Sequence, residues 1–379
     1  MEKFMIARKI ESYILESLVP GKVVILLGAR RTGKTVLLNK IVSMVSEPYI
    51  FFNGEDFEVQ RLLENRTVAN YEKILGTSRL LVIDEAQKIP DIGKILKLMV
   101  DSIPGLRVIV TGSSAFDLTG KLGEPLTGRN QTFRLFPLSE QELDPLYGLV
   151  EKRSALEERL VFGSYPEVIS LQGSAAKAKY LKELVNDYLL RDLLSFEGVK
   201  NAGVIKNLLR LVAFQAGAEV SMSELASNLG ISRNTVEKYL DLLSKVYVIF
   251  KVEGFSRNLR KEITKNAKWY FYDNGIRNTL VANINPLELR NDTGSLWENF
   301  VISERVKYQE YNDILSNNFF WRTYDKQEID WIEEREGKLF AYEFKFNKEK
   351  AKFPVAFSTA YPDSEFRVIS VKNYHEFVM

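Results

Sequence analysis

Runs dominated by apolar residues divide the first part of the chain and predict the strands of a parallel sheet. Such runs are typical of strands that are buried on both faces. Five of them occur, at residues 23–27, 49–53, 80–85, 107–114 and 132–136. A helical pattern of apolar residues, at Val36, Leu37, Ile41 and Val45, follows the first run after the short segment 28–35. The pattern therefore predicts an α/β fold built on a five-stranded parallel sheet.

Two short helices and two strands are predicted in the middle of the chain. A helix at 224–229 begins with the spacing of a capping box, and Gly230 separates it from a second helix at 233–245. Two short helices joined by a glycine-containing turn are typical of a helix-turn-helix. Alternating segments at 246–252 and 268–272 add two strands. Together these elements predict a winged helix.

Alternation with a period of two returns near the C-terminus. Residues 327–332 alternate as a strand, and residues 339–346 return as the next strand. The charged segment 333–338 between them contains Gly337 and is predicted to be a turn. We expect a helix upstream at 296–302 and several amphipathic helices across 139–200.

Composition excludes several kinds of chemistry. The 379 residues include no cysteine and one histidine, His375, so thiolate zinc sites, cysteine nucleophiles and multi-histidine metal sites are excluded. The remaining groups favour phosphoryl chemistry with Mg²⁺, which prefers oxygen ligands. The net charge is only +2, yet residues 200–270 carry 12 basic and 6 acidic side chains. No apolar run approaches the roughly 20 residues of a membrane span, and the N-terminus lacks a signal peptide pattern. We therefore expect a cytoplasmic protein without membrane contact.

The first apolar run leads into a loop that matches a phosphate-binding motif in full. Residues 28–35 read GARRTGKT, which fits GxxxxGK[ST] between a strand and a helix. The glycines let backbone amides point at phosphates, and the helix N-terminus adds partial positive charge. We predict that Lys34 reaches the β- and γ-phosphates and that Thr35 binds Mg²⁺. The predicted ATP-binding residues of the loop are Gly28, Ala29, Arg30, Arg31, Thr32, Gly33, Lys34 and Thr35.

A second apolar run ends in two acids about fifty residues later. In this pattern Asp84 holds Mg²⁺, usually through water, and Glu85 polarises the attacking water. The strand at 107–114 ends in hydroxyl groups, and we predict Ser113 as the sensor of the γ-phosphate. Three core strands with incidental polar ends are the plainer alternative. The combination predicts an ATP site with Mg²⁺.

Arg129 follows Gly128 just before the fifth apolar run. An arginine at this place would act as a finger on the γ-phosphate of a neighbouring subunit and neutralise charge in the transition state. That role requires a homo-oligomer or a lid that folds back on the site. The alternative is a surface arginine that pairs with Glu124 or with its own loop.

Four segments, in this order, resemble AAA-type ATPases of bacteria and archaea that pair an AAA module with a C-terminal domain of unknown function. They are GARRTGKT, LLVIDEAQKIP, VIVTGSSAFDL and LTGR. The resemblance extends over nearly the whole chain and implies ATP binding and hydrolysis. Arg129, which follows Gly128, matches the arginine of the family's pattern. Helices that follow an AAA core commonly form a lid over the nucleotide, which we expect at 139–200. The resemblance leaves the use of the ATP open.

The predicted winged helix carries candidate contacts to nucleic acid. Residues early in the recognition helix contact bases or phosphates in such folds. The wing is basic, with Lys268 among its residues, and a basic wing suits phosphates. The predicted contacts are Ser232, Arg233, Asn234 and Lys238 on the helix, and Arg257, Arg260 and Lys261 on the wing. Winged helices also dock proteins, so a protein partner is the alternative to DNA.

Acidic side chains gather in the C-terminal strands. Strand geometry places Glu343 and Lys345 on one face, and Asp330 can reach the same place across the hairpin. With Glu298 upstream, this set resembles the PD-(D/E)xK nuclease superfamily, although isoleucine rather than proline precedes Asp330. The resemblance implies that Asp330, Glu343 and Glu298 hold Mg²⁺ and that Lys345 positions or activates water. Charges on a half-exposed hairpin would give the same letters.

The pattern as a whole predicts four parts: an ATPase core at 1–138, a helical lid at 139–200, a winged helix at 201–285 and a nuclease-like α/β domain at 286–379. The first hypothesis is a Mg²⁺-dependent ATPase coupled to nucleic-acid binding, with DNA as the expected partner and nuclease activity left open. The alternative is a nucleotide-controlled switch or scaffold that binds proteins and has an inactive nuclease-like domain. A small-molecule kinase fits poorly, because the extra domains would have no task.

Overall fold

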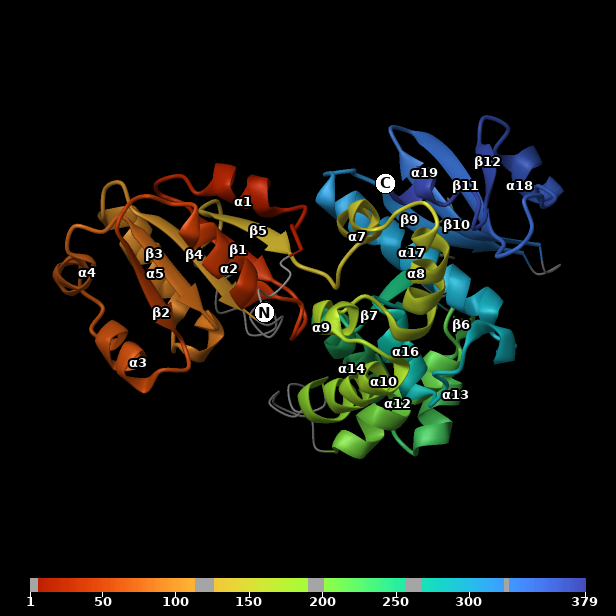
Figure 1. The fold of residues 1–379 in the computed structure, drawn as a ribbon, viewed down its shortest axis with the longest axis horizontal. Helices are drawn as coiled ribbons and strands as arrows, with labels where there is room; N and C mark the ends of the chain where they lie inside the picture. Colours follow the sequence, from red (N-terminus) through yellow and green to blue (C-terminus); the bar gives the residue numbers. More distant parts are fainter. Residues whose placement is uncertain (1–5, 113–125, 190–200, 257–266, 324–326) are drawn as a thin grey trace. The chain divides into compact units, whose positions relative to one another are not determined.

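The computed structural model describes residues 6–112, 126–189, 201–256, 267–323 and 327–379 (Figure 1). The chain divides into two compact units. The first unit contains residues 1–136 and 245–247, and the second contains residues 137–244 and 248–379. Each unit has its own sheet.

The sheet of the first unit is parallel throughout and has the strand order β2-β3-β4-β1-β5. Its strands are β1 (Val23–Leu27), β2 (Tyr49–Asn53), β3 (Leu80–Asp84), β4 (Arg107–Gly112) and β5 (Asn130–Arg134). The predicted five-stranded parallel sheet is confirmed, and β5 begins two residues before the apolar run that predicted it. Every residue of β1 and β3 is buried, as their continuous apolar runs indicate.

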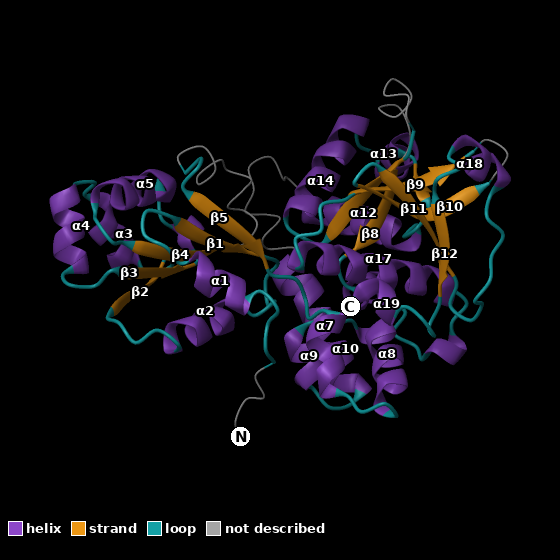
Figure 2. Cartoon of the chain, turned by 90° about the horizontal axis from the view of Figure 1, so that it is seen from above, coloured by secondary structure: helices purple, strands orange, loops and turns teal. Residues whose placement is uncertain are grey.

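Helices cover both faces of this sheet. They are α1 (Glu11–Ser17), α2 (Lys34–Ser43), α3 (Phe57–Glu64), α4 (Val68–Leu75), η1 (Ala86–Lys88) and α5 (Ile92–Ser102). Helices α1 and α2 contact each other on one face, and α4 and α5 contact each other on the other (Figure 2). Because the strands are parallel, the carboxyl ends of β1, β3 and β4 meet at one edge, where ligands of open α/β sheets bind.

The second unit is built on a mixed seven-stranded sheet with the order β12-β11-β10-β9-β7-β8-β6. Its strands are β6 (Glu219–Val220), β7 (Ile249–Gly254), β8 (Ala267–Phe271), β9 (Asn317–Arg322), β10 (Glu328–Arg335), β11 (Lys338–Phe344) and β12 (Glu365–Ile369). Strands β7 and β8 pair antiparallel, as a winged helix requires. Strand β7 also pairs in parallel with β9, so the predicted winged helix and the predicted nuclease-like strands share one sheet.

The helices of the second unit include the predicted helix-turn-helix. They are α7 (Glu140–Leu143), η2 (Asp144–Leu146), α8 (Glu151–Phe162), α9 (Pro166–Ser170), α10 (Ser174–Glu183), η3 (Leu184–Leu189), α12 (Ala202–Phe214), α13 (Met222–Leu229), α14 (Arg233–Lys245), α16 (Asn274–Leu280), η4 (Leu287–Leu289), α17 (Thr293–Tyr311), α18 (Val355–Ala360) and α19 (His375–Val378). Helix α14 has the predicted bounds, and α13 begins two residues early. None of the helices among the described residues combines the length and the apolar character of a membrane span.

Helix α17 is the central helix of the second unit. It is much longer than the segment 296–302 that predicted it, and it contacts both β8 and β11. Trp297 and Phe300 of α17 pack with Phe320 of β9 and Trp331 of β10 in one buried cluster. This packing holds the helix against the shared sheet and places its polar residues at fixed positions relative to β8, β10 and β11.

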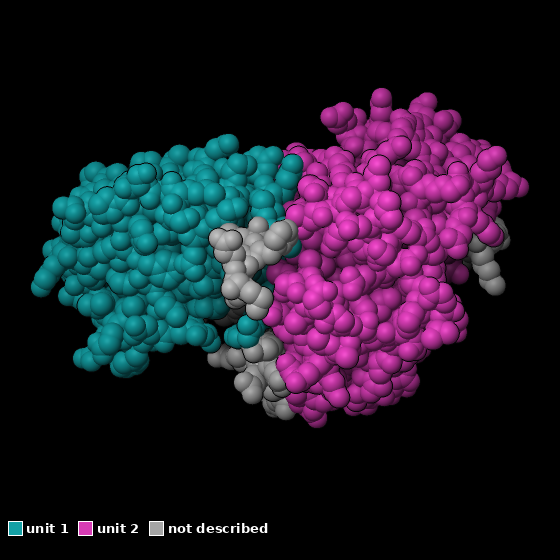
Figure 3. Space-filling model, in the orientation of Figure 1, with its two compact units in different colours: residues 1–136, 245–247 teal, residues 137–244, 248–379 magenta. Residues whose placement is uncertain are grey.

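The described helices of residues 139–200 belong to the second unit (Figure 3). Helices α8 and α10 contact α16. The side chain of Asn278 in α16 donates to the carbonyls of Leu160, at 3.0 Å, and Val161, at 2.8 Å. Apart from residues 245–247, the described parts of the three predicted segments 139–200, 201–285 and 286–379 therefore belong to one compact unit. A lid function for the first of them stays a prediction.

The charged segment 333–338, predicted to be a turn, begins as part of a strand. Strand β10 continues to Arg335, and the tight turn is Glu336 and Gly337, with φ of 50° and 76°. Glu333 is fully buried and accepts hydrogen bonds from Arg305, Nε at 2.6 Å and Nη2 at 2.8 Å. A charge is tolerated inside a protein when it is paired and hydrogen-bonded. The prediction of a charged turn that starts at Glu333 is therefore wrong, because Glu333 lies in β10.

Candidate functional site

The predicted phosphate-binding loop lies between β1 and α2, at the carboxyl edge of the first sheet. A Cβ on Gly28 would collide with the carbonyl oxygen of Leu135, so only glycine fits there. Gly33 has φ of 96°, a left-handed conformation that favours glycine, and it caps the start of α2. Gly28 is thus required because the backbone of Leu135 lies so close, and Gly33 is favoured because of its backbone conformation.

Lys34 lies across this loop. Its buried ammonium donates to the carbonyl oxygens of Gly28, at 2.9 Å, and Ala29, at 3.0 Å. The hydroxyl of Thr32 donates to Ala29 O at 2.8 Å, and Arg8 Nη1 donates to Thr32 O at 2.7 Å. The loop is therefore held in shape by its own polar groups. In the same loop Arg30 is half-buried and Arg31 is exposed.

Asp84 joins the loop to the neighbouring strands. Its Oδ2 accepts from Thr35 Oγ1 at 2.8 Å, which brings together the two predicted Mg²⁺ ligands. Its Oδ1 accepts from Thr111 Oγ1, and Thr111 Oγ1 also accepts from the backbone N–H of Glu85 at 3.1 Å. Sequence reasoning missed Thr111. The signal was a hydroxyl inside the buried strand β4, two residues before Ser113.

Glu85 directly follows β3 and has a left-handed backbone with φ of 51°. Its Oε2 accepts from Gln87 Nε2 at 2.5 Å. A Cβ on Gly54 would collide with the carbonyl oxygen of Glu85, so the neighbouring turn has room only for glycine. Ser113, the predicted sensor, lies outside the described residues.

Arg129 lies at the opposite end of the sheet from the phosphate-binding loop. The register of β1 and β5 pairs Val23 with Asn130 and Leu27 with Arg134. Arg129 therefore lies beside the start of β1, and the loop follows its end, roughly 16 Å away at 3.3 Å per residue. The guanidinium, with 41% of the side chain exposed, pairs with Asp101. A role as a finger on a neighbouring subunit stays a prediction.

The second unit brings together the acids and the lysine of the nuclease resemblance. We call Glu298 of α17, Asp330 of β10, Glu343 of β11 and the adjacent Lys345 the carboxylate centre. The backbone N–H of Phe344 donates to Asp330 Oδ2 at 2.8 Å, and Lys345 Nζ lies 2.6 Å from Glu343 Oε1. A register shift in β10 places two residues, Asp330 among them, opposite one residue of β9. Such bulges redirect side chains and are frequent beside active sites.

The acids of the carboxylate centre lack sufficient positive charge. Burial raises the pKa of Asp330 to about 8, and the carboxylates of Glu298 and Glu343 contribute to the shift. Burial also raises the pKa of Glu298, against the lowering effect of Lys268. A divalent cation would supply the missing charge, and a donor set made only of oxygens fits Mg²⁺.

Lys345 keeps its proton in this surrounding. Burial lowers its pKa, but the carboxylate of Glu343, followed by those of Asp330 and Glu298, outweighs burial and raises it. A lysine with a raised pKa is a poor general base at neutral pH. Of the two roles implied by the resemblance, the arrangement favours positioning of water over removal of its proton.

Two residues of β8 belong to this site and were missed. Lys268 is 2% exposed, and its Nζ lies 2.6 Å from Glu328 Oε1 and 3.6 Å from Glu298 Oε1. Tyr270 donates to Glu298 Oε1 at 2.7 Å. Sequence reasoning placed Lys268 on a basic wing that contacts phosphates, which is wrong, because the lysine is buried and pairs with Glu298 and Glu328. The available signal was a single lysine inside the otherwise apolar strand AKWYF.

The start of α14 is open to solvent, as the helix-turn-helix prediction requires. Ser232 Oγ accepts from the N–H of Thr235 at 3.1 Å, and Arg233 pairs with Glu237 at 3.0 Å. Arg233, Asn234 and Lys238 are exposed. The predicted wing contacts Arg257, Arg260 and Lys261 lie outside the described residues.

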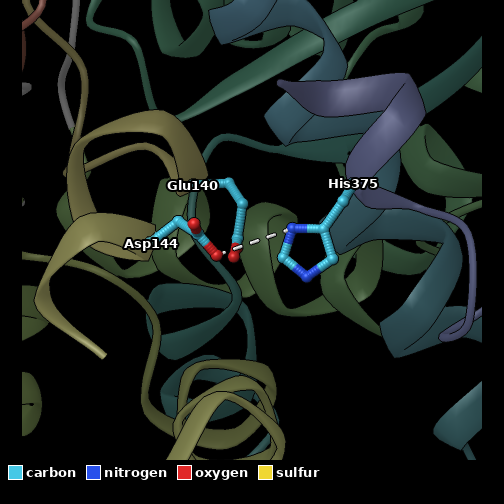
Figure 4. Close-up of side chains that lie close together, drawn as sticks. All are labelled: Glu140, Asp144 and His375. Carbon is cyan, nitrogen blue, oxygen red and sulfur yellow. Dashed lines mark ion pairs between the residues drawn. The ribbon is translucent and has the colours of Figure 1, made fainter. Parts of the chain in front are cut away.

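One further group in the second unit has the spacing of metal ligands. Ligand atoms of Glu140, Asp144 and His375 lie within 4.8 Å of one another (Figure 4). Arg159 pairs with Glu140 at 2.9 Å, and Lys152 pairs with Asp144 at 2.6 Å. These cations already neutralise the two acids, so we assign the group a structural role.

Three family models match consecutive segments of the chain. A model described as an AAA domain matches residues 20–143. A domain of unknown function (DUF8612) matches residues 153–292, and another domain of unknown function (DUF4143) matches residues 293–376. The first match contains the phosphate-binding loop and Asp84, and the third contains the carboxylate centre.

Similar proteins occur in bacteria and archaea. The chain is 27% identical over 327 residues to an uncharacterized protein of Mycobacterium tuberculosis, covering 85% of this chain and 70% of that protein. It is 26% identical over 367 residues to an uncharacterized protein of Methanocaldococcus jannaschii, covering 91% and 80%. A structure of the Thermotoga maritima RuvB Holliday junction branch migration motor aligns at 18% identity and a TM-score of 0.32, covering 65% of this chain and 90% of that one. At that TM-score the likeness supports no argument about function. The chain thus carries an AAA ATPase domain followed by two domains of unknown function, an organisation that rests on the matched segments.

Proposed function

We propose that this chain is a Mg²⁺-dependent ATPase whose second unit binds DNA and hydrolyses phosphodiester bonds. The observation that carries the proposal is the convergence of Glu298, Asp330 and Glu343 beside Lys345. Carboxylates that hold a divalent cation, together with a lysine that orients water, are the groups that metal-dependent hydrolysis requires. The exposed start of α14 in the same unit offers a surface for nucleic acid.

In the nucleotide site, the proposal assigns one role to each polar group. Lys34 leaves its two loop carbonyls and binds the β- and γ-phosphates, because charged phosphate oxygens are stronger acceptors than carbonyls. Thr35 and Asp84 would hold Mg²⁺, and Glu85 would polarise the attacking water. Thr111 keeps Asp84 oriented through its hydroxyl group.

In the carboxylate centre, Glu298, Asp330 and Glu343 would hold Mg²⁺. When bound there, the cation would supply Lewis-acid activation of the phosphodiester group. Lys345, fixed by Glu343, orients the attacking water and attracts the phosphate. Lysine at this place contributes as a charge, in keeping with its raised pKa.

Turnover of ATP, measured with and without DNA of several shapes, tests the first half of the proposal. We expect stimulation by DNA. We expect Glu85→Gln to lower turnover by about 10²–10³-fold while ATP still binds, because the site loses the group that acts on water. Glu55→Gln, at an exposed acid of the same unit, is the control. Unchanged turnover in Glu85→Gln would show that the assignment of Glu85 is wrong.

Cleavage of DNA with Mg²⁺ or Mn²⁺ tests the second half. We expect Asp330→Asn and Lys345→Ala each to lower cleavage by about 10²–10³-fold. Glu349→Gln and Lys348→Ala, at exposed residues just beyond β11, are matched controls. Cleavage that survives both site variants would belong to a contaminant. Salt-dependent DNA binding without cleavage by the wild-type chain would leave the carboxylate centre without its proposed reaction.

DNA affinity across salt concentrations tests the surface on α14. Reversing the charge of a side chain that contacts a phosphate weakens DNA binding uniformly across sequences and reduces the salt dependence of the affinity. We expect both effects in Arg233→Glu and Lys238→Glu, and neither in Lys179→Glu, an exposed lysine of α10. Equal affinity in all three variants would exclude α14 and favour protein docking by this helix.

A further inference from the structure

Strand β8 places a buried ammonium group inside the carboxylate centre. Lys268 Nζ lies 2.6 Å from Glu328 Oε1 and 3.6 Å from Glu298 Oε1, and the side chain is only 2% exposed. Residues two apart on a strand share a face, so Tyr270 lies beside Lys268 and donates to the same Glu298 oxygen at 2.7 Å. Both residues come from the strand pair of the predicted winged helix.

The surroundings of Glu298 are closed around this contact. A Cβ on Gly217, in the loop before β6, would lie 3.0 Å from Glu298 Oε1, so the backbone there approaches closely. Lys268 also lies over the ring of Phe320, 5.3 Å from its centroid. The ammonium therefore lies in a fixed, water-poor place, where it cannot swing out to solvent as a surface lysine would.

Each candidate ligand of the carboxylate centre is held through one oxygen. Those oxygens are Glu298 Oε1, bound by Tyr270, Asp330 Oδ2, bound by the N–H of Phe344, and Glu343 Oε1, paired with Lys345. Hydrogen bonds from neighbouring groups orient carboxylate ligands and tune the metal that they bind. The uncharged hydroxyl of Tyr270 can do this at no electrostatic cost. The charged Lys268 repels a divalent cation held by the same carboxylate.

We propose that Lys268 is a built-in counter-ion of the carboxylate centre, which neutralises Glu298 and Glu328 in the absence of a divalent cation and weakens the binding of that cation. Tyr270 is the positioning residue that orients Glu298 as a ligand. This inference rests on the proposed function, since it takes the carboxylate centre to be a cation site. It assigns to β8, a strand of the winged helix, control over the metal affinity of the nuclease-like strands.

Binding of Mn²⁺ to the full nucleotide-free chain, followed by calorimetry, tests the inference. The Mn²⁺ binding that belongs to the carboxylate centre is the part of the measured binding that is lost in Asp330→Asn. We expect Lys268→Met to bind Mn²⁺ at least tenfold more tightly than the wild-type chain, because a repelling charge is gone. We expect Tyr270→Phe to bind several-fold more weakly, because Glu298 loses its orientation. A role limited to packing would not move the two variants in opposite directions.

Lys268→Met takes from Glu328, whose side chain is 36% exposed, its partner in this ion pair, so a second comparison guards against a loss of folding. Glu328→Gln and the double variant Lys268→Met with Glu328→Gln differ only in the lysine. We expect tighter Mn²⁺ binding in the double variant, again by about tenfold. Mn²⁺ should also raise the melting temperature of Lys268→Met by more than that of the wild-type chain.

The outcomes separate the inference from the proposed function. Mn²⁺ affinity that is unchanged or lower in Lys268→Met and in the double comparison would overturn the inference and leave the carboxylate centre as a cation site. Failure of both the wild-type chain and Lys268→Met to bind Mn²⁺ in an Asp330-dependent manner would overturn the two together. Binding that appears only once Lys268 is replaced would support the inference most strongly.

Discussion

The nucleotide site of the first unit and the carboxylate centre of the second differ in how their charges are balanced. In the first, both oxygens of Asp84 accept from hydroxyl groups, and Lys34 is held by two carbonyl oxygens. In the second, burial and the carboxylates of Glu298 and Glu343 raise the pKa of Asp330 to about 8. The first site is satisfied by neutral partners, and the second retains repulsion between acids.

This difference separates two ways of preparing a site for a cation. Hydrogen bonds from Thr35 and Thr111 keep Asp84 in place and can be exchanged for a ligand with little rearrangement. Buried acids with too little positive charge are instead costly until a cation or protons arrive. We therefore expect the stability of the second unit, much more than that of the first, to depend on pH and on divalent cations.

The largest expected effect isolates the nucleotide site. Lys34→Ala should lower ATP turnover by about 10³-fold, because the transferred phosphate loses its main positive contact. The substitution should leave Asp330-dependent Mn²⁺ binding unchanged, since Lys34 belongs to the other unit. Phosphate release and Mn²⁺ calorimetry measure the two quantities, and Lys97→Ala, at an exposed lysine of α5, is the control. A large loss of Mn²⁺ affinity in Lys34→Ala would mean that the two sites are coupled.

The next largest effect concerns the repulsion between the acids of the carboxylate centre and its influence on the stability of the folded chain. The pKa of Asp330 is about 8 in the folded chain and near the usual 3.8 once unfolded, so the folded state binds its proton more tightly. The free energy of unfolding in metal-free buffer should therefore fall as pH rises from about 4 to about 8. We expect a loss of about 2–3 kcal/mol between pH 5 and pH 8, below the limit of about 1.4 kcal/mol per pH unit.

Tryptophan fluorescence can follow this effect in one unit. The four tryptophans, at positions 269, 297, 321 and 331, all lie in the second unit. Urea unfolding with a chelator at pH 5 and pH 8 should show the loss, and Asp330→Asn should reduce it. Mg²⁺ or Mn²⁺ at pH 8 should restore stability in the wild-type chain only. A pH dependence identical in Asp330→Asn would assign it to other buried acids, such as Glu304, whose pKa burial also raises.

A smaller effect tests the neutral hydroxyl groups of the nucleotide site. Thr111→Val removes the donor to Asp84 Oδ1 and keeps the shape of the side chain. The substitution also removes the acceptor of the Glu85 N–H. A hydrogen bond to a carboxylate contributes about 1.5 kcal/mol or more, which corresponds to at least a roughly tenfold fall in ATP turnover. ATP hydrolysis at saturating Mg²⁺ measures it, with Thr67→Val, at the cap of α4, as a control outside the site. Wild-type turnover in Thr111→Val would reduce this contact to a packing role.

The same contrast decides how much of each site was predictable. Lys34 and the glycines of the loop stand in one continuous motif whose geometry is local, so a single segment predicts strand, loop and helix. Asp84 follows from a second local pattern. Thr111 does not, because its value depends on which side chain of β4 reaches Asp84, and that depends on how the strands pair.

The carboxylate centre was predictable only in part. Its four named residues follow from strand alternation and from a family resemblance. The pairing of β7 with β9 joins segments about seventy residues apart, and no local pattern encodes such a contact. That pairing turns Lys268 from a wing residue into a buried ion-pair partner of Glu298 and Glu328. The register shift beside Asp330 is likewise a property of the assembled sheet.

The smallest expected effect concerns Arg129. In its own chain this guanidinium lies beside the start of β1 and pairs with Asp101, whereas the phosphate-binding loop follows the end of β1. We therefore expect Arg129→Ala to change the turnover of dilute protein less than twofold. At concentrations where subunits associate, a finger acting between chains would make the same variant lose turnover by 10³-fold or more. Turnover per subunit, measured for wild-type and Arg129→Ala proteins across a dilution series, separates the two.

A large loss of turnover that persists at the highest dilution would contradict the placement of Arg129 away from the phosphates. Equal turnover at all concentrations would limit this arginine to its exposed pair with Asp101. The contribution of such a pair to stability is typically below about 1 kcal/mol.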